Sequence, residues 1–210
     1  MDKEIKKPVG SSDQDAALVR AIQAGDMAAF DQMVVKHKDK LFNMVYWFLG
    51  DYQEANDCSQ EIFIKVFKSI KKFRSESSFS TWLYRIAINT CKNRLKSSAY
   101  RWKKKTVPLE NPESSEDGSL SYKIQNNSPS PANELEKKER LMMIQKAINA
   151  LPQEQNRVIV LRDIQGLSYQ EISDITGLNL GTVKSRLARA RLELRNKLNR
   201  TQIFADPPAM

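Results

Sequence analysis

The 210-residue sequence predicts an all-α protein made of two helical domains joined by a flexible linker. Apolar residues recur at three- and four-residue steps through residues 16–105 and again through 133–200, as they do on one face of an α-helix. Between these regions, residues 106–132 contain four prolines amid Ser, Asn and Glu, with few side chains that could build a core. Residues 1–15 and 201–210 are polar or proline-containing, so we expect both ends to be flexible.

Turn and capping residues divide the first domain into four predicted helices. Glycine stops the first two, because it is the residue that most readily leaves a helix. The predicted helices run from about Asp15 to Ala24, from Asp26 to Gly50, from Asp51 to about Ile70, and from near Ser80 past Arg94. Aromatic and aliphatic residues on their apolar faces can form one core.

The second domain, residues 133–200, ends in a predicted helix-turn-helix. Its helical periodicity has one break, at Pro152. Further on, Ser168 and Glu171 have the spacing of a capping box, and Gly177 marks a tight turn before a helix rich in Arg and Lys. In a helix-turn-helix, this second helix enters the major groove of DNA.

The last predicted helix has a buried face and a polar, basic face. Its apolar residues form one stripe, made of Val183, Leu187, Ala190, Leu194 and Leu198. Short hydroxyl groups and long cationic side chains lie on the other faces, where they suit contacts with phosphates and base edges. The candidate DNA-binding residues are Thr182, Lys184, Ser185, Arg186 and Arg189. A small bundle with a solvated basic face is the alternative, and the capping box argues against it.

Charge and motif content favour a polyanionic partner and give no support for an enzyme. The net charge is +9, which favours nucleic acid. No run of about twenty apolar residues could span a membrane, and the N-terminus lacks the apolar core of a signal peptide, so we expect a cytoplasmic protein. Phosphate loops, nucleophile elbows and metal-ligand motifs are absent from the sequence, so we predict no catalytic residue, metal, cofactor or small-molecule substrate.

Three isolated reactive side chains are expected to be structural. Cys58 and Cys91 each lie in a predicted helix, and we expect buried free thiols because disulfides are rare in reducing compartments. His37 is the one histidine of the chain, and we expect it on an exposed helix face. With no clustered Cys beside it, a zinc site is not predicted.

An acidic edge lies on the predicted third helix. Asp57, Gln60 and Glu61 border the exposed end of its apolar stripe. On a basic protein, such an edge suits a protein partner better than it suits DNA. The pattern alone leaves open that this is an ordinary solvated helix face.

Aromatic, amide and basic side chains alternate through residues 73–96. A surface of this kind can stack unpaired bases, hydrogen-bond their edges and hold their backbone. The alternative is that the apolar members belong to the core, and we expect this of Trp82 and Ile86.

These segments resemble a bacterial RNA polymerase sigma factor of the extracytoplasmic-function (ECF) group of the sigma-70 family. Residues 73–95 resemble the region that reads the minus-10 element, residues 57–67 the polymerase-binding segment, and residues 151–191 the minus-35-binding domain. The resemblance covers nearly all of residues 16–200 outside the linker. Three motifs in this order are specific, whereas many regulators share a helix-turn-helix.

The resemblance implies two DNA contacts and several protein partners. The first domain would dock on the beta-prime subunit of core polymerase through its acidic edge, and would capture a flipped base of the minus-10 strand. Phe73 and Asn89 match the base pocket, with Arg74 and Lys92 as backbone contacts. The second domain would bind minus-35 duplex through its candidate residues. The linker would run near the active-site and RNA-exit channels of the polymerase, formed by its beta and beta-prime subunits.

The resemblance also implies control by an anti-sigma factor, which in this family is often anchored in the membrane. One departure concerns the loop after Phe73-Arg74, where the family often has glycine and this chain has Ser75. Two other functions stay open at this point. One is a stand-alone helix-turn-helix regulator with a sensing domain, against which residues 73–95 argue, and the other is an RNA-binding or antitermination factor.

Overall fold

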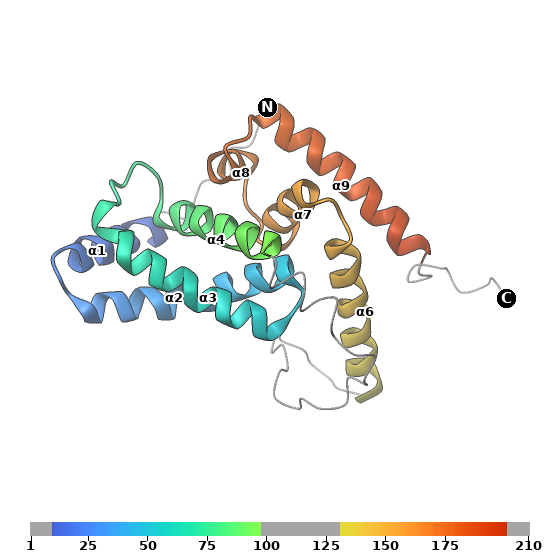
Figure 1. Ribbon diagram of the computed structural model, residues 1–210, viewed down its shortest axis with the longest axis horizontal. Helices are drawn as coiled ribbons and strands as arrows, with labels where there is room; N and C mark the ends of the chain where they lie inside the picture. Colours follow the sequence, from blue (N-terminus) through green and yellow to red (C-terminus); the bar gives the residue numbers. More distant parts are fainter. Residues whose placement is uncertain (1–9, 98–130, 201–210) are drawn as a thin grey trace.

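The computed structural model describes residues 10–97 and 131–200, and within these ranges every regular element is helical (Figure 1). The α-helices are α1 (Gly10–Gln23), α2 (Met27–Leu49), α3 (Tyr52–Ser69), α4 (Phe79–Lys96), α6 (Pro131–Asn149), α7 (Gln153–Ile159), α8 (Tyr169–Thr176) and α9 (Leu180–Arg200). A 3-10 turn, Ile70–Lys72, follows α3, and a π-helical turn, Val160–Ile164, follows α7. The all-α prediction is confirmed. Of the predicted linker, 106–132, residues 106–130 lie outside the described residues, and residues 131–132 are the first two of α6.

Capping side chains place the helix starts near the predicted positions. Asp26 accepts a hydrogen bond from the Ala29 N–H at the start of α2, and Asp51 and Ser78 cap α3 and α4 in the same way. Each bond satisfies a backbone N–H that has no partner within its own helix. Gly50 ends α2 with φ of +75°, in the left-handed conformation that glycine adopts without steric cost.

Helix α1 differs most from the sequence-based expectation. It begins at Gly10, ahead of the expected start at Asp15, so residues 10–15 belong to a helix and not to a flexible end. Asp15 is buried, and its carboxylate lies 3.3 Å from Nε2 of His37 and 2.7 Å from Nζ of Lys36, both on α2. These contacts hold the first turns of α1 against α2.

His37 is therefore a buried residue, and the expectation of an exposed one is wrong. Its side chain also lies against the ring of Phe79, with ring centroids 5.2 Å apart. A polar residue on an otherwise apolar helix face can be buried when a partner satisfies it. Asp15, from another helix, is that partner, and the sequence pattern of α2 alone does not reveal it.

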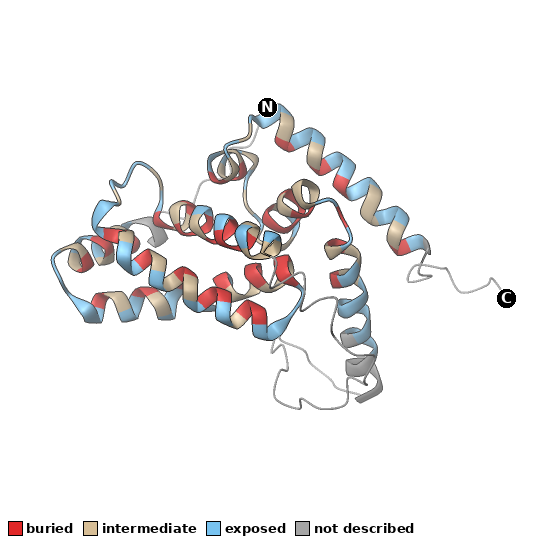
Figure 2. Ribbon diagram, in the orientation of Figure 1, coloured by how far each residue is buried: buried red, intermediate tan, exposed pale blue. Residues whose placement is uncertain are grey.

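Helices α1 to α4 form the first half of the molecule around one apolar core. Met33, Leu41, Met44, Ile62 and Leu83 are fully buried there. Figure 2 shows buried residues on the inward faces of these helices and exposed residues on the outer faces. Trp82 and Ile86 are partly buried and pack against this core, in line with the expectation for them.

Helices α6 to α9 form the second half, in which α7 and α8 pack against α9. Val158, Leu161, Ile172, Val183 and Leu187 are among its fully or almost fully buried residues. Helix α9 lies on the outer side of this half, away from the four-helix bundle (Figure 1). This position leaves one face of α9 in solvent.

The two halves meet through side chains that donate to helix-end carbonyls. Gln145 of α6 donates to the carbonyls of Tyr46 and Trp47 near the end of α2, at 3.3 and 3.1 Å. Arg85 of α4 donates to the carbonyl of Asp174 in α8, at 2.7 Å. Carbonyls in the last turn of a helix have no partner within that helix, so those of Trp47 and Asp174 are available to such donors. The Tyr46 carbonyl also accepts from the Gly50 N–H at 2.8 Å.

Candidate nucleic-acid and protein interfaces

The helix-turn-helix is built by the local signals that the sequence contains. The Ser168 hydroxyl accepts from the Glu171 N–H at 3.2 Å, and the Glu171 carboxylate accepts from the Ser168 N–H at 2.9 Å, so the predicted capping box is present. Gly177 ends α8 with φ of +72°. The Ile172 and Ile175 side chains are buried and hold α8 against the core. Together these contacts set the angle at which α9 leaves the turn.

Helix α9 presents a polar and basic face opposite its buried stripe. Val183, Leu187, Ala190 and Leu198 are buried as predicted, and Leu194 is half-buried. Of the candidate DNA-binding residues, Lys184, Ser185 and Arg189 are exposed and Thr182 is half-buried. The Thr182 N–H donates to the Asn179 side chain at 2.7 Å, so Asn179 satisfies one of the free N–H groups at the start of α9.

Arg186 is placed differently from the other candidates. Its guanidinium forms an ion pair with Glu154 of α7, which also contacts Arg157 at 3.1 Å. The Arg186 side chain is less than a third exposed. It therefore points from α9 toward α7 and is already paired, whereas Arg189 lies on the solvent face.

A second ion pair fastens α9 to the π-helical turn. Arg191 donates to both carboxylate oxygens of Asp163, at 2.6 and 3.0 Å, in a two-pronged geometry. Arg162 in the same turn lies over the Tyr169 ring at 4.8 Å, and Lys184 approaches that ring at 5.9 Å. These contacts position α8 and α9 relative to each other.

In the first half, Phe73 belongs to an aromatic cluster at the start of α4. Its ring centroid lies 4.8 Å from that of Trp82 and 6.3 Å from that of Phe79. Gln23 of α1 donates to the carbonyls of Ile70 and Phe73, both at 2.9 Å, and so holds the loop in place. Phe73 is half-buried, which leaves part of its ring accessible beside this cluster.

The loop that follows contains the one non-glycine residue with positive φ among the residues described. Ser75 has φ of +56°, a conformation that costs a residue with a side chain roughly 1–2 kcal/mol. This backbone geometry explains why glycine suits the position. Arg74, beside it, is exposed.

A stripe of potential base and backbone contacts runs along α4 from the aromatic cluster. Trp82, Arg85, Asn89 and Lys92 are spaced three, four and three residues apart, so they share one helix face. Asn89 is exposed and lies about 10 Å along the helix from Trp82, at 1.5 Å per residue. The structure thus brings Phe73, Asn89 and Lys92 to one side of the bundle.

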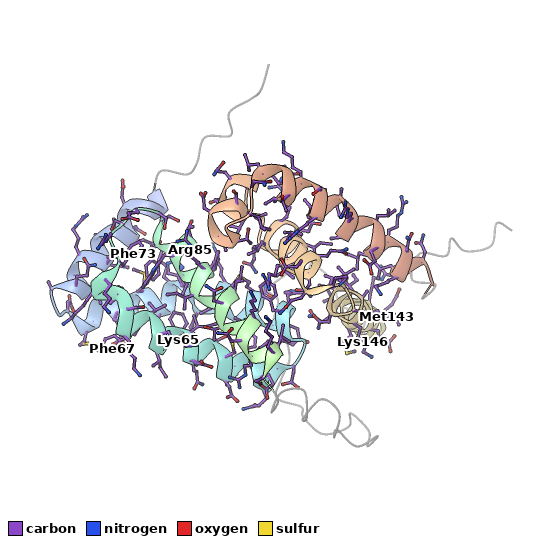
Figure 3. The ribbon with its side chains drawn as sticks, turned by 45° about the horizontal axis from the view of Figure 1, so that its top comes forward. Lys65, Phe67, Phe73, Arg85, Met143 and Lys146 are labelled. Carbon is purple, nitrogen blue, oxygen red and sulfur yellow. The ribbon has the colours of Figure 1, made fainter. Side chains whose placement is uncertain are left out.

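Arg85 is a member of this stripe that the sequence reasoning missed. It is exposed, and in Figure 3 it lies between α4 and α8, where it donates to Asp174. Its spacing from Asn89 was the signal that could have identified it.

The acidic edge of α3 is organised by an arginine from α4. Asp57 and Gln60 are exposed and Glu61 is half-buried, as a protein-binding edge requires. Arg94 lies 2.8 Å from Glu54, 3.3 Å from Glu61 and 3.8 Å from Asp57, measured between nitrogen and oxygen atoms. Lys65 pairs with Glu61 at 2.6 Å. Arg94 was also missed, because nothing in its own segment indicates a partner on another helix.

Exposed apolar side chains border this edge on α3. Ile64 is 54% exposed and Phe67 is 43% exposed, and the Phe67 ring packs edge-on against Phe30 at 5.0 Å. Phe67 lies on the outer side of α3 in Figure 3, whereas Lys65 donates to the Thr90 hydroxyl of α4 at 3.2 Å. Apolar groups beside charged ones are typical of a protein-binding surface.

Among the described residues there is neither a cluster of metal-binding side chains nor a helix that could span a membrane. Across residues 10–97 and 131–200, no three His, Cys, Asp or Glu side chains gather closely enough to hold a metal ion. Within the same ranges, no helix combines the length and the apolar character needed to cross a membrane.

Comparison with protein families finds two matches in the order that the sequence suggested. Residues 33–101 match the model for sigma-70 region 2, and residues 141–194 match the model for sigma-70, region 4. The first contains the aromatic cluster and the acidic edge, and the second contains the helix-turn-helix.

Known relatives match along most of the chain. It is 38% identical over 181 residues to the RNA polymerase sigma-H factor of Pseudomonas aeruginosa, covering 86% of this chain and 92% of that protein. It is 36% identical over 184 residues to the ECF RNA polymerase sigma-E factor of Escherichia coli K12, covering 88% and 94%. A solved structure of the sigma factor RpoE with the anti-sigma factor NepR from Bartonella quintana shares the fold, with a TM-score of 0.58 at 24% identity, covering 81% and 96%.

Proposed function

Because the chain belongs to the ECF group of the sigma-70 family of RNA polymerase sigma factors, we propose that it binds core polymerase, directs it to promoters with particular minus-10 and minus-35 elements, and promotes their melting. The observation that carries the proposal is the pair of surfaces in one chain. One is a stripe of aromatic, amide and basic side chains on α4, and the other is the basic face of a helix-turn-helix on α9.

The α4 stripe suits an unpaired strand. Unstacking a base costs a few kcal/mol, which stacking and edge hydrogen bonds in a pocket can offset. Phe73, beside Trp82, offers the aromatic surface, and the exposed Asn89 amide can pair with a base edge. Arg74 and Lys92 supply positive charge for the backbone. Together these residues would capture the minus-10 strand and so favour melting.

The α9 face suits duplex DNA. We assign minus-35 contacts to Thr182, Lys184, Ser185 and Arg189, which reach solvent on one side of the helix. Arg186 belongs to the same proposed site, but its pairing with Glu154 makes an indirect role the better-supported one. Phosphate contacts by these cations would add affinity that falls with salt.

The acidic edge suits the polymerase. Asp57, Gln60 and Glu61, with the apolar Ile64 and Phe67 beside them, form a surface of mixed charge and apolar character on α3. We propose that core polymerase binds here through its beta-prime subunit, and that the beta subunit completes the complex. A partner with a basic and apolar surface would complement this edge.

We extend the proposal to the organisation of the chain and its control. Residues 16–105 and 133–200 would act as the two promoter-reading domains, with 106–132 as the linker through the polymerase. An anti-sigma factor would hold the protein inactive, as the partner named for the Bartonella quintana structure suggests. Because polymerase and promoter DNA are cytoplasmic, the protein would act there, with membrane attachment only through that inhibitor.

Run-off transcription with purified bacterial core polymerase on a promoter library tests this function. We expect transcripts that depend on the protein and share two upstream sequence motifs. If operator DNA binds tightly to the protein alone while no transcript depends on it, the chain is an ordinary DNA-binding regulator and the proposal is wrong.

A further inference from the structure

Two buried thiols face each other across the packed helices α3 and α4. The sulfur atoms of Cys58 and Cys91 lie 3.9 Å apart, and both cysteines are free. Neither is accessible, with exposures of 0% for Cys58 and 2% for Cys91. Both cysteines were predicted to be buried free thiols, but their contact was not predicted, since 33 residues separate them in the sequence.

The hydrogen bond between the thiols, their burial and nearby charges make the two cysteines unequal. The hydrogen bond with Cys91 lowers the pKa of Cys58, and the positive charges of Arg94 and Lys65 lower it further, against the opposing effects of burial and of Glu61. The pKa of Cys91 is raised well above its usual value, first by its hydrogen bond to Cys58 and then by burial. Cys58 is therefore the thiol that ionises first, and a thiolate is the reactive form of cysteine.

We propose that Cys58 and Cys91 form a reversible oxidation site, in which a hydroperoxide converts the two thiols into a disulfide that links α3 to α4. Disulfides in reducing compartments are typically transient and redox-sensing. Hydrogen peroxide is small enough to reach such a pair through thermal opening of the surrounding helices.

The oxidation takes place in two steps, first at Cys58 and then at Cys91. The Cys58 thiolate attacks one oxygen of hydrogen peroxide, an S–O bond forms, the O–O bond breaks, and the leaving hydroxide takes up a proton to become water. The Cys91 sulfur then attacks the sulfur of the sulfenic acid, an S–S bond forms, the S–O bond breaks, and a second water leaves with the Cys91 proton. Two thiols lose two electrons, and one peroxide gains them. A cellular dithiol would reverse the reaction by thiol–disulfide exchange.

Closing the bond requires the helices to adjust. The sulfur atoms must approach from 3.9 Å to about 2 Å, the length of a disulfide bond. Cys58 follows Asp57 in the acidic edge, and Cys91 lies between Asn89 and Lys92 on α4. On the proposed function, this movement would disturb the polymerase edge and the minus-10 stripe together, so oxidation would lower transcription.

Mass spectrometry of the intact full-length protein tests the site independently of its function. Treatment of dilute reduced protein with hydrogen peroxide should lower its mass by about 2 Da, the two thiol hydrogens. Trypsin cleaves after Lys40, Lys65, Arg85 and Lys92, so the bond should join peptide 41–65 to peptide 86–92. Cys58→Ala and Cys91→Ala variants should not form this product, and dithiothreitol should reverse it in the wild type.

A comparison of folded with denatured protein tests whether the fold itself favours the disulfide between Cys58 and Cys91. The same protein in denaturant, given the same peroxide, shows how fast two unconstrained cysteines react. The proposal is overturned if the folded protein keeps both thiols while the unfolded chain is oxidised. It is also overturned if the folded protein gains only oxygen atoms on one cysteine or links two molecules together.

Run-off transcription with the quenched, oxidised protein separates this proposal from the proposed function. The wild type should lose activity on oxidation and regain it with dithiothreitol, and a Cys58→Ala/Cys91→Ala variant treated alike should not change. If the 2 Da loss occurs without any change in transcription, the oxidation site stands and its regulatory role is overturned. If reduced protein supports no transcription at all, the proposed function fails, whatever the mass shows.

Discussion

At the scale of single residues, the partner of a charged side chain decides whether that side chain can reach DNA. Arg186 and Arg189 lie three residues apart on α9, yet Arg186 is paired with Glu154 and Arg189 is exposed. A paired arginine fixes the recognition helix, whereas an exposed one can read a base edge or hold a phosphate. Alanine substitutions of Arg186 and Arg189 should therefore change minus-35 binding in different ways.

Arg186→Ala should weaken minus-35 binding by a similar factor on every sequence, because it loosens α9 from α7 and removes no base contact. Arg189→Ala should cost about 1–3 kcal/mol mainly at one base position if it reads that base. Polymerase-dependent binding to a minus-35 library measures both patterns. A Glu154→Arg/Arg186→Glu exchange should recover part of the binding that Arg186→Ala loses. If Arg186→Ala instead weakens binding at one base position alone, Arg186 reads that base directly.

Ser75 is the residue whose backbone is most at odds with its side chain. Its φ of +56° suits glycine, so Ser75→Gly should raise the free energy of unfolding by about 0.5–1 kcal/mol after the greater freedom of glycine in the unfolded chain is subtracted. Urea unfolding measures the change. Ser77→Gly in the same loop is the matched control. It should not raise the free energy of unfolding, because Ser77 does not have positive φ.

At the scale of elements, side chains between helices fix how the first half is assembled. Asp15 and His37 join α1 to α2, and Arg94 joins α4 to the acidic edge of α3. Both contacts bury polar groups that need their partners. Loss of one partner should therefore change the stability of the two helices that it joins, or the charge and shape of the surface that they form.

The burial of His37 should make stability depend on pH. Burial lowers the pKa of His37 below its usual 6.5, against the opposing effect of Asp15. The unfolded chain then binds more protons near neutral pH, so stability is highest above pH 6.5 and falls as the pH drops through the folded pKa. His37→Gln should flatten this dependence, with a change of at most about 1.4 kcal/mol per pH unit.

Because His37 is the one histidine of the chain, the wild-type minus variant difference isolates its titration. Urea unfolding at several pH values between about 5 and 8 measures it, a window centred on the ordinary histidine pKa. A difference that stays constant with pH would show that His37 does not titrate differently on folding.

The acidic edge of α3 should control polymerase binding through its charge. Asp57→Arg with Glu61→Arg reverses two charges that face a partner, and we expect loss of core binding in a pull-down or fluorescence-anisotropy assay. Asp13→Arg with Asp39→Arg reverses as much charge at exposed positions of α1 and α2, outside the proposed polymerase surface, and should leave binding unchanged. Equal binding by all three proteins would place the polymerase contact elsewhere.

At the scale of the whole molecule, the two halves share one apolar core and are also joined by polar contacts. Gln145 and Arg85 donate across the boundary, and Gly50 comes so close to Asn149 that a β-carbon there would lie 2.0 Å from Nδ2 of Asn149. Gly177 has nearly the same φ and has no such neighbour. The two glycines thus form a matched pair that reports on this contact.

Gly50→Ala should lower the free energy of unfolding more than Gly177→Ala does. Both substitutions cost about 1–2 kcal/mol for the left-handed backbone, but only Gly50→Ala must also displace Asn149. Urea unfolding measures both, and adding Asn149→Ala to Gly50→Ala should remove the difference. Equal losses for the two glycine substitutions would mean that the Asn149 side chain turns aside without a measurable cost.

Most of the helices, several of their caps, the helix-turn-helix and the family can be predicted from the sequence alone. These features depend on local signals, such as Asp26 and Ser168 at helix starts, Gly50 and Gly177 at helix ends, and apolar residues at helical spacing. Such signals act between residues a few positions apart, so they can be read without knowing what packs against them. The exposed positions Lys184, Ser185 and Arg189 follow from the same periodicity.

The side chains that meet across helices depend on the tertiary packing and could not be predicted from the sequence. This packing buried His37 against Asp15, paired Arg186 with Glu154, gathered the acidic edge around Arg94 and brought Cys58 to Cys91. Each of these pairs joins residues on different helices. Periodicity specifies the face of a helix on which a residue lies, but the side chain opposite that face is set by how the helices pack, because packing depends on the shape of the whole core.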